Sequence, residues 1–264
     1  MNNNSHTLNF RRCAKPGAPV LVLVHGFLAS SAYWLPTVVG LRRFFDIIAV
    51  DLPGFGGSAH VTPPDSIQGV AAMIERDLDA LGVERYSLVG CSLGGMISQQ
   101  FAIDHPGRLD GLVLYGTAAQ GDLPDRFESW DASIARLQGQ DVEMLADKAI
   151  ATWFIDGANH PYFPTCREAG RGASKDACIT LMRNMQKWSA VEQLGTIRAR
   201  TLVLVGDRDN STKPAESFRI WRAIPAASLV VIPGCSHGVH MEDPATFNRV
   251  VGDFLLEPRK EAAT

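Results

Sequence analysis

The chain has 264 residues, of which 46% are hydrophobic, enough for one large α/β domain or two small ones around a buried core. Its formal net charge is −3, from 25 Lys and Arg against 28 Asp and Glu, and neither sign forms a long block, so the charge pattern does not support nucleic-acid binding. No apolar run approaches the roughly 18–20 residues that span a bilayer, and the N-terminal segment lacks the apolar core of a signal peptide.

These features favour a cytoplasmic protein without membrane contact, and the cysteines agree with that expectation. The chain has five, an odd number, and none of them forms a C-x-x-C pair. The pattern therefore indicates neither a disulfide framework nor a zinc site. The sequence leaves a monomer and a homo-oligomer open.

Short, continuous apolar runs recur along the chain and are typical of strands that are buried on both faces of a parallel sheet. A segment near residues 8–12 adds a candidate edge strand. The other predicted strands are residues 20–24, 46–50, 86–90, 111–115, 201–205 and 229–232.

Segments with helical periodicity separate these strands. Residues 66–81 carry apolar side chains at spacings of three and four, which forms a stripe along one face of a helix. Further helices are predicted at residues 95–104, 214–223 and 244–256. The alternation of strand and helix predicts an α/β fold with a mostly parallel sheet and right-handed crossovers.

One long segment, residues 117–194, breaks this alternation. It is rich in Trp, Phe, Met and charged residues at helical spacing, and we predict three or four helices with a turn near residues 170–174. An insertion of this length after a strand end commonly covers a site. The expected organisation is a core formed by residues 1–116 and 195–264, with a helical cap formed by residues 117–194.

The stretch "YSLVGCSLGGM" places Ser92 in a G-x-S-x-G pattern between a predicted strand and a predicted helix. In that context the serine sits on a sharp, strained turn, and small residues are needed at Gly90 and Gly94 because a side chain there would clash with neighbouring backbone. The N-terminus of the following helix supplies N–H donors for developing negative charge. Ser92 is therefore a candidate nucleophile.

A nucleophilic serine requires a base and an orienting acid, which follow it in the order acid, histidine. The histidine after the last predicted strand is His237, and the acid is expected in "LVGDRDNSTKP", which contains Asp207 and Asp209. Two backbone N–H groups must hold the oxyanion. We assign them to Leu93, directly after the serine, and to Phe27 in the loop "HGFL".

The blocks "LVHGF", "DLPGFGGS", "GCSLGG", "GDRD" and "GCSHGVHMEDP" resemble, in order, the signature blocks of the α/β-hydrolase superfamily. The resemblance implies the α/β-hydrolase fold, a cap over the nucleophile and no cofactor. It also points to Asp209 rather than Asp207 as the acid, because the family's acid is usually the third residue after the glycine at the strand end.

A narrower resemblance concerns the cap. "LYGTAAQGDLPDRFESWDASIARLQGQ" and "LADKAIATWF" are similar to the cap of 3-oxoadipate enol-lactonases, which hydrolyse a small lactone bearing a carboxylate. If the likeness extends to the pocket, an arginine of the cap would hold that carboxylate. The candidates are Arg126, Arg136, Arg167, Arg171 and Arg183.

Other residues near these motifs have structural interpretations. Asp207 is expected to hold a turn, His25 to hold its loop by hydrogen bonds, and His240 to lie on the surface or behind the site. The Cys91 side chain is expected to pack in the interior, pointing away from the exposed turn. Trp130, Trp153 and Trp188 are candidates to line the pocket, with ordinary packing in the cap as the alternative.

The sequence thus predicts a serine hydrolase that cleaves a small carboxylic ester or lactone through an acyl-enzyme, with neither metal nor organic cofactor. One alternative is a C–C bond hydrolase acting on a ring-cleavage dienoate, since the same triad serves that chemistry. Another is a non-catalytic ligand-binding receptor on a hydrolase fold. In each case the partner is a small molecule rather than nucleic acid or a membrane.

Overall fold

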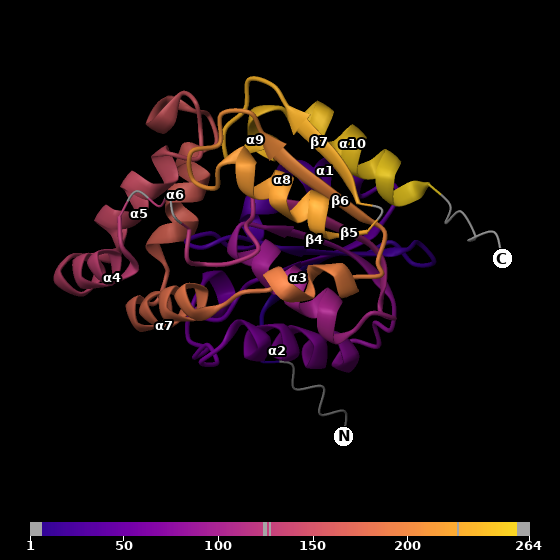
Figure 1. Cartoon of the computed structure of the whole chain (residues 1–264), viewed down its shortest axis with the longest axis horizontal. Helices are drawn as coiled ribbons and strands as arrows, with labels where there is room; N and C mark the ends of the chain where they lie inside the picture. The colour runs from indigo at the N-terminus through magenta and orange to yellow at the C-terminus, as the bar shows by residue number, and fades with distance from the viewer. Residues whose placement is uncertain (1–6, 124–125, 127, 226, 258–264) are drawn as a thin grey trace.

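A seven-stranded sheet runs through the molecule in the order β1-β3-β2-β4-β5-β6-β7 (Figure 1). The computed structural model describes residues 7–123, 126, 128–225 and 227–257. Strand β1 pairs with β3 in antiparallel fashion, and the other neighbouring pairs are parallel. The strands are β1 (Phe10–Cys13), β2 (Val20–Val24), β3 (Asp46–Val50), β4 (Tyr86–Cys91), β5 (Leu109–Tyr115), β6 (Thr201–Gly206) and β7 (Ser228–Ile232).

The central strands form where the apolar runs predicted them. Every residue of β3, β4 and β6 is buried, as expected for strands covered by helices on both faces. Strands β2 and β3 have the predicted bounds, whereas β4 continues one residue further, to Cys91. This extension brings the strand directly up to Ser92.

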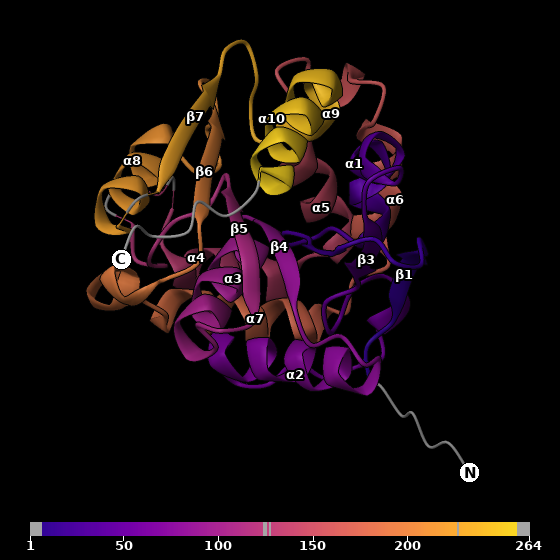
Figure 2. The ribbon, with the colours of Figure 1, turned by 90° about the vertical axis from the view of Figure 1, so that its right-hand side faces the viewer.

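Two pairs of helices cover the sheet. Helix α2 packs against α3, and α1 packs against α10; in Figure 2 the two pairs lie on opposite sides of β4 and β5. The Ser66 side chain caps α2 by accepting a hydrogen bond of 3.0 Å from the Gly69 N–H. The core helices are α1 (Leu35–Leu41), α2 (Ile67–Ala80), α3 (Leu93–Asp104), α8 (Pro214–Ala223), α9 (Val239–Glu242) and α10 (Pro244–Leu256).

The predicted insertion is helical and lies between β5 and β6. Its helices are α4 (Trp130–Gly139), α5 (Val142–Ala151), α6 (Phe163–Arg171) and α7 (Lys175–Lys187), which gather on the left in Figure 1. Helix α5 packs on α6 and α4 on α7. The predicted turn separates α6 from α7, where Ser174 caps α7.

The exact boundaries of core and cap remain a prediction. Residues 1–6 and 258–264 of the expected core, and residues 124, 125 and 127 of the expected cap, lie outside the described residues. Within the described part of the chain, no helix is both long enough and apolar enough to cross a membrane.

Candidate active site

Ser92 occupies a strained turn between β4 and α3. Its φ of 53° and ψ of −117° lie outside the regions that non-glycine residues ordinarily adopt. A Cβ added at Gly90 would collide with the carbonyl of Gly94, and one added at Gly94 would collide with the carbonyl of Val24. The two glycines therefore permit the close backbone packing that holds this turn, as the motif predicts.

His237 and Asp209 form a buried pair at the ends of two neighbouring strands. The His237 Nδ1 lies 2.7 Å from the Asp209 Oδ2, and the exposed fractions of the two residues are 4% and 2%. The second oxygen of Asp209 accepts hydrogen bonds from the N–H groups of Ser211, at 2.8 Å, and Thr212, at 2.9 Å. This arrangement places the proton on Nδ1 and leaves Nε2 available as a base.

Burial and the nearby carboxylate act on the pKa of His237 in opposite directions. Burial disfavours the charged imidazolium, but the charge of Asp209 and its hydrogen bond, with a smaller contribution from Cys91, outweigh this effect, so the pKa of His237 is raised well above its usual value of 6.5. The aspartate thus stabilises the imidazolium that would form when the histidine takes a proton.

Asp207, the other acid candidate, has a different contact. Its Oδ1 accepts a hydrogen bond of 2.7 Å from the Gly234 N–H and holds the turn after β7. The geometry thus brings Asp209 to the histidine and leaves Asp207 in the structural role that was expected of it.

Two further histidines are buried in structural positions. His25 donates from Nδ1 to the Gly26 carbonyl at 2.7 Å and accepts at Nε2 from the Leu52 N–H at 3.0 Å, so it ties two loops together as expected. Burial lowers the pKa of His25 to about 4. His240 is fully buried, not on the surface; its Nε2 donates to the Tyr33 carbonyl at 2.9 Å, and burial lowers its pKa to about 3.

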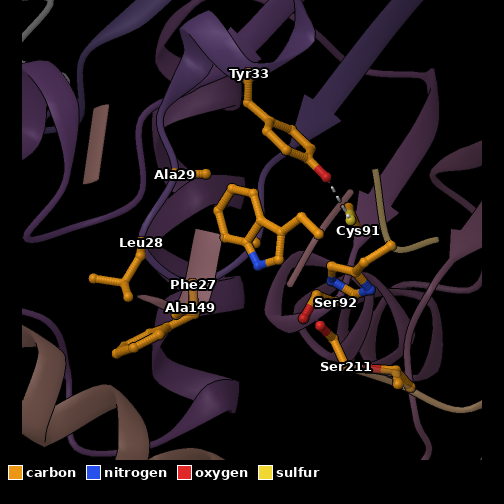
Figure 3. A pocket seen from close by; sticks show the side chains of 12 residues that line it. Phe27, Leu28, Ala29, Tyr33, Cys91, Ser92, Ala149 and Ser211 are labelled. Atoms are coloured by element: carbon orange, nitrogen blue, oxygen red, sulfur yellow. Dashed lines mark hydrogen bonds between the residues drawn. The ribbon is translucent and has the colours of Figure 1, made fainter. Parts of the chain in front are cut away.

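A small cavity of about 100 Å³ lies over Ser92 and His237 (Figure 3). An engineered cavity of roughly 150 Å³ holds a benzene ring, so a space of this size suits a small acyl group. Apart from the imidazole of His237, uncharged side chains and backbone form its walls. The lining residues are Gly26, Phe27, Leu28, Ala29, Tyr33, Cys91, Ser92, Ala149, Trp153, Ser211, Thr212 and His237.

The two predicted oxyanion donors come from two segments that meet at the serine. Leu93 is the first residue of α3, and N–H groups in the first turn of a helix have no acceptor within that helix. Phe27 lines the cavity, and the loop that carries it passes so close that a Cβ on Gly26 would lie 3.1 Å from the Ser92 Cβ. Leu28, which follows Phe27, has a positive φ of 59° and also lines the cavity.

Of the three candidate tryptophans, only Trp153 is among the residues that line the cavity, and its ring centroid lies 6.4 Å from that of His237. Trp130 donates from Nε1 to the Gly121 carbonyl at 3.0 Å. Trp188 is buried and donates to the Gln100 Oε1 at 2.9 Å. These two side chains help to hold the cap.

Cys91 and Tyr33 are among the lining residues that the sequence did not predict. Cys91 is buried, as expected, but it lines the cavity beside Ser92 instead of pointing away from it. Its Sγ lies 3.5 Å from the hydroxyl of Tyr33, which points toward it in Figure 3. The place of Cys91 in the cavity could have been inferred from its position next to Ser92 in the sequence. No sequence motif indicated that Tyr33 would line the cavity.

The sequence profile described as the alpha/beta hydrolase fold matches residues 19–244, and the chain belongs to this family. Among its relatives is a protein named "Putative carbamate hydrolase RutD" from Pseudomonas savastanoi pv. phaseolicola, 28% identical over 92% of this chain and 96% of the relative.

Solved structures show the same fold. A thermophilic esterase from Thermogutta terrifontis, solved with malate bound, has a TM-score of 0.84 at 28% identity over 94% of this chain and 92% of the other. An enol-lactonase from Burkholderia xenovorans LB400 has a TM-score of 0.88 at 24% identity, covering 95% of this chain and 96% of its own. The latter likeness concerns the fold alone.

Proposed function

We propose that this α/β hydrolase is a serine hydrolase that cleaves a small carboxylic ester or lactone. The observation that carries the proposal is the convergence of Ser92 with the buried pair of His237 and Asp209 at one small cavity. The likeness to an esterase at 28% identity supports the same reaction class.

In the proposed mechanism, the Nε2 of His237 takes the hydroxyl proton as Ser92 attacks the substrate carbonyl. The N–H groups of Phe27 and Leu93 stabilise the oxyanion of the tetrahedral intermediate. His237 then gives its proton to the leaving alcohol, and an acyl-enzyme remains on Ser92. Water, deprotonated by the same histidine, attacks the acyl group and releases the acid.

The walls of the cavity favour an uncharged acyl group. A carboxylate that enters it loses water and meets hydroxyls, a thiol and apolar carbon; no Lys or Arg is among the lining residues, and His237 must be neutral to act as the base. Candidate arginines of the cap pair with carboxylates instead: Arg136 with Glu128, and Arg167 with Asp147 at 2.9 Å. We therefore propose neutral substrates in place of the carboxylated lactone that the narrower resemblance implies.

A carbamate is the second substrate class, favoured by the name of the relatives at 28% identity and below. A carbamate has the same attackable carbonyl, and its amino group is small and uncharged. The same mechanism would form a carbamoyl-serine.

The test combines labelling with a substrate panel. A fluorophosphonate probe should label the protein, and the label should map to Ser92. The panel contains p-nitrophenyl acetate, a small neutral lactone, a small carbamate and a vinylogous 1,5-diketone. Turnover confined to the diketone would favour the C–C hydrolase, and absence of both labelling and turnover would favour the ligand-binding receptor.

A further inference from the structure

The last residue of α9, Glu242, connects two parts of the molecule that are far apart in sequence. Its Oε2 accepts a hydrogen bond of 2.6 Å from the Ser236 N–H, immediately before His237. Its Oε1 accepts a hydrogen bond of 2.7 Å from the Ile155 N–H, in the cap. One carboxylate thus bridges residues 233–238, the histidine loop, and residues 152–155, the cap segment.

Further contacts join the same two segments. The Gly238 N–H donates to the Trp153 carbonyl at 2.7 Å, and the Ser236 hydroxyl donates to the Thr152 carbonyl at 3.2 Å. The packing is close: a Cβ on Gly238 would lie 2.9 Å from the Phe154 ring. The residues that flank His237 on both sides are therefore bonded to the cap.

The cap segment also reaches the loop that carries the acid. The Thr152 and Ser211 hydroxyl oxygens lie 3.3 Å apart, and the Ser211 N–H donates to Asp209. Trp153, from the same segment, lines the cavity. The cap segment thus contacts the acid loop, the histidine loop and the substrate cavity.

We propose that Glu242 is a positioning residue that fixes His237 and the docked cap in one common arrangement. The inference rests on the proposed function of Ser92, His237 and Asp209. A carboxylate suits this task because it offers two acceptor oxygens, one for each N–H, and hydrogen bonds from N–H groups to a charged acceptor are stronger than those to a neutral one.

Glu242→Gln tests the proposal with little change in shape. The amide has one acceptor oxygen, so it can satisfy either Ser236 or Ile155, and its NH₂ group then faces the other N–H. We expect kcat to fall on the order of 10²-fold, the size of effect produced by a displacement of about 1 Å at the reacting groups. KM for p-nitrophenyl acetate should change less than threefold, because Glu242 does not line the cavity.

Asp207→Asn is the matched control. It is also a change from carboxylate to amide, and Asp207 also holds the histidine loop, but among the described residues it accepts a single backbone hydrogen bond, from Gly234. The remaining amide oxygen can keep that bond, so kcat should stay within twofold of the wild type. If loss of a negative charge beside this loop were the cause, kcat would fall equally in Glu242→Gln and Asp207→Asn.

A second variant addresses the cap side. Ile155→Pro removes the donor N–H while Glu242 keeps its bond to Ser236; the Ile155 side chain is 48% exposed. This variant should also change kcat more than it changes KM. If Glu242→Gln does not fold, Ile155→Pro still tests the proposal. The Nδ1 proton of His237, observed by NMR, should exchange faster with water in both variants.

Unchanged kcat in Glu242→Gln, a loss confined to KM, or a loss that only follows the folded fraction in a melting curve would overturn the proposal. A wild-type protein that neither reacts with the fluorophosphonate nor turns over any substrate would instead overturn the proposed function. The two failures are therefore distinguishable.

Discussion

The Tyr115 hydroxyl, at the end of β5, donates a hydrogen bond to the backbone carbonyl of His237. Both residues are buried, and Tyr115 is completely enclosed. Because β5 also neighbours β4, which leads into Ser92, this bond links the position of the base to the strands that position the nucleophile.

Tyr115→Phe should therefore destabilise the protein and slow the reaction. Removal of the donor leaves the His237 carbonyl without this partner, at a cost of about 1–3 kcal/mol in the free energy of unfolding. We expect kcat to fall by several-fold, measured on p-nitrophenyl acetate. Tyr86→Phe is the control: the Tyr86 hydroxyl is buried and has no hydrogen-bond partner among the described residues. If the two variants unfold at the same denaturant concentration, the Tyr115 hydrogen bond contributes nothing to the free energy of unfolding.

Ser92→Ala should abolish turnover and leave the fold intact. The alanine side chain is smaller than that of serine and fits the same turn, and loss of a nucleophile in such a triad costs on the order of 10⁶-fold in kcat. His237→Ala should give a comparable loss. Circular dichroism and the melting temperature check the fold, and an unfolded Ser92→Ala protein would contradict our reading of the turn.

Asp209→Asn should reduce kcat on the order of 10⁴-fold, since an amide neither stabilises the imidazolium nor fixes the tautomer that leaves Nε2 free. Asp207→Asn should have little effect, because its oxygen can still accept from Gly234. Steady-state kinetics on both variants decide the assignment, and a larger loss at position 207 would reverse it.

The pH dependence of kcat/KM should have an acid limb above the usual histidine range. His237 must be neutral to act as a base, and its raised pKa means that the neutral form predominates only at a pH well above 6.5. Activity should therefore rise with pH through the raised pKa.

Stability should change in the opposite direction. The folded protein holds the proton of His237 more tightly than the unfolded chain, so this contribution to the free energy of unfolding is fully present below the unfolded pKa and is lost as pH rises through the folded pKa. Denaturant titrations across this range measure it. For the activity profile, an acid limb of kcat/KM at or below pH 6.5 would contradict the predicted rise in the pKa of His237.

Short, neutral acyl groups should be the best substrates. p-Nitrophenyl acetate or propionate should exceed a C12–C16 ester in kcat/KM because the cavity is small. The neutral dimethyl succinate should exceed monomethyl succinate, because no Lys or Arg among the lining residues would receive the free carboxylate. Rates across the series check both parts. A faster long-chain ester would make this a lipase-like enzyme, and a preferred free acid would restore the enol-lactonase-like expectation.

Much of the fold follows from local sequence patterns. Strands β2 and β3 were predicted with their bounds because continuous apolar runs are what a doubly covered strand requires. Helix α1 was not predicted: it is short, and Leu35 and Val39 are exposed, so no clean apolar stripe marks it. Its position depends on packing against α10, from the far end of the chain.

The site divides in the same way. Ser92, Asp209 and His237 stand next to recognisable turns at strand ends, so their proximity could be predicted from the order of the motifs. The burial of His240 could not, because it results from Tyr33 and Trp34, which lie in a short helix far away in the sequence. Nor did any pattern in the cap distinguish Trp153 from Trp130 and Trp188, since only three-dimensional packing decides which side chain faces the cavity.

The position of Trp153 gives the protein a built-in optical signal. Its indole lines the cavity beside the His237 imidazole, and a protonated imidazole quenches indole emission more strongly than a neutral one. The difference in fluorescence between the wild type and Trp153→Phe should therefore report the charge of His237 directly. A pH titration of this difference would then give the pKa of His237 in the folded protein, without a substrate or a coloured leaving group.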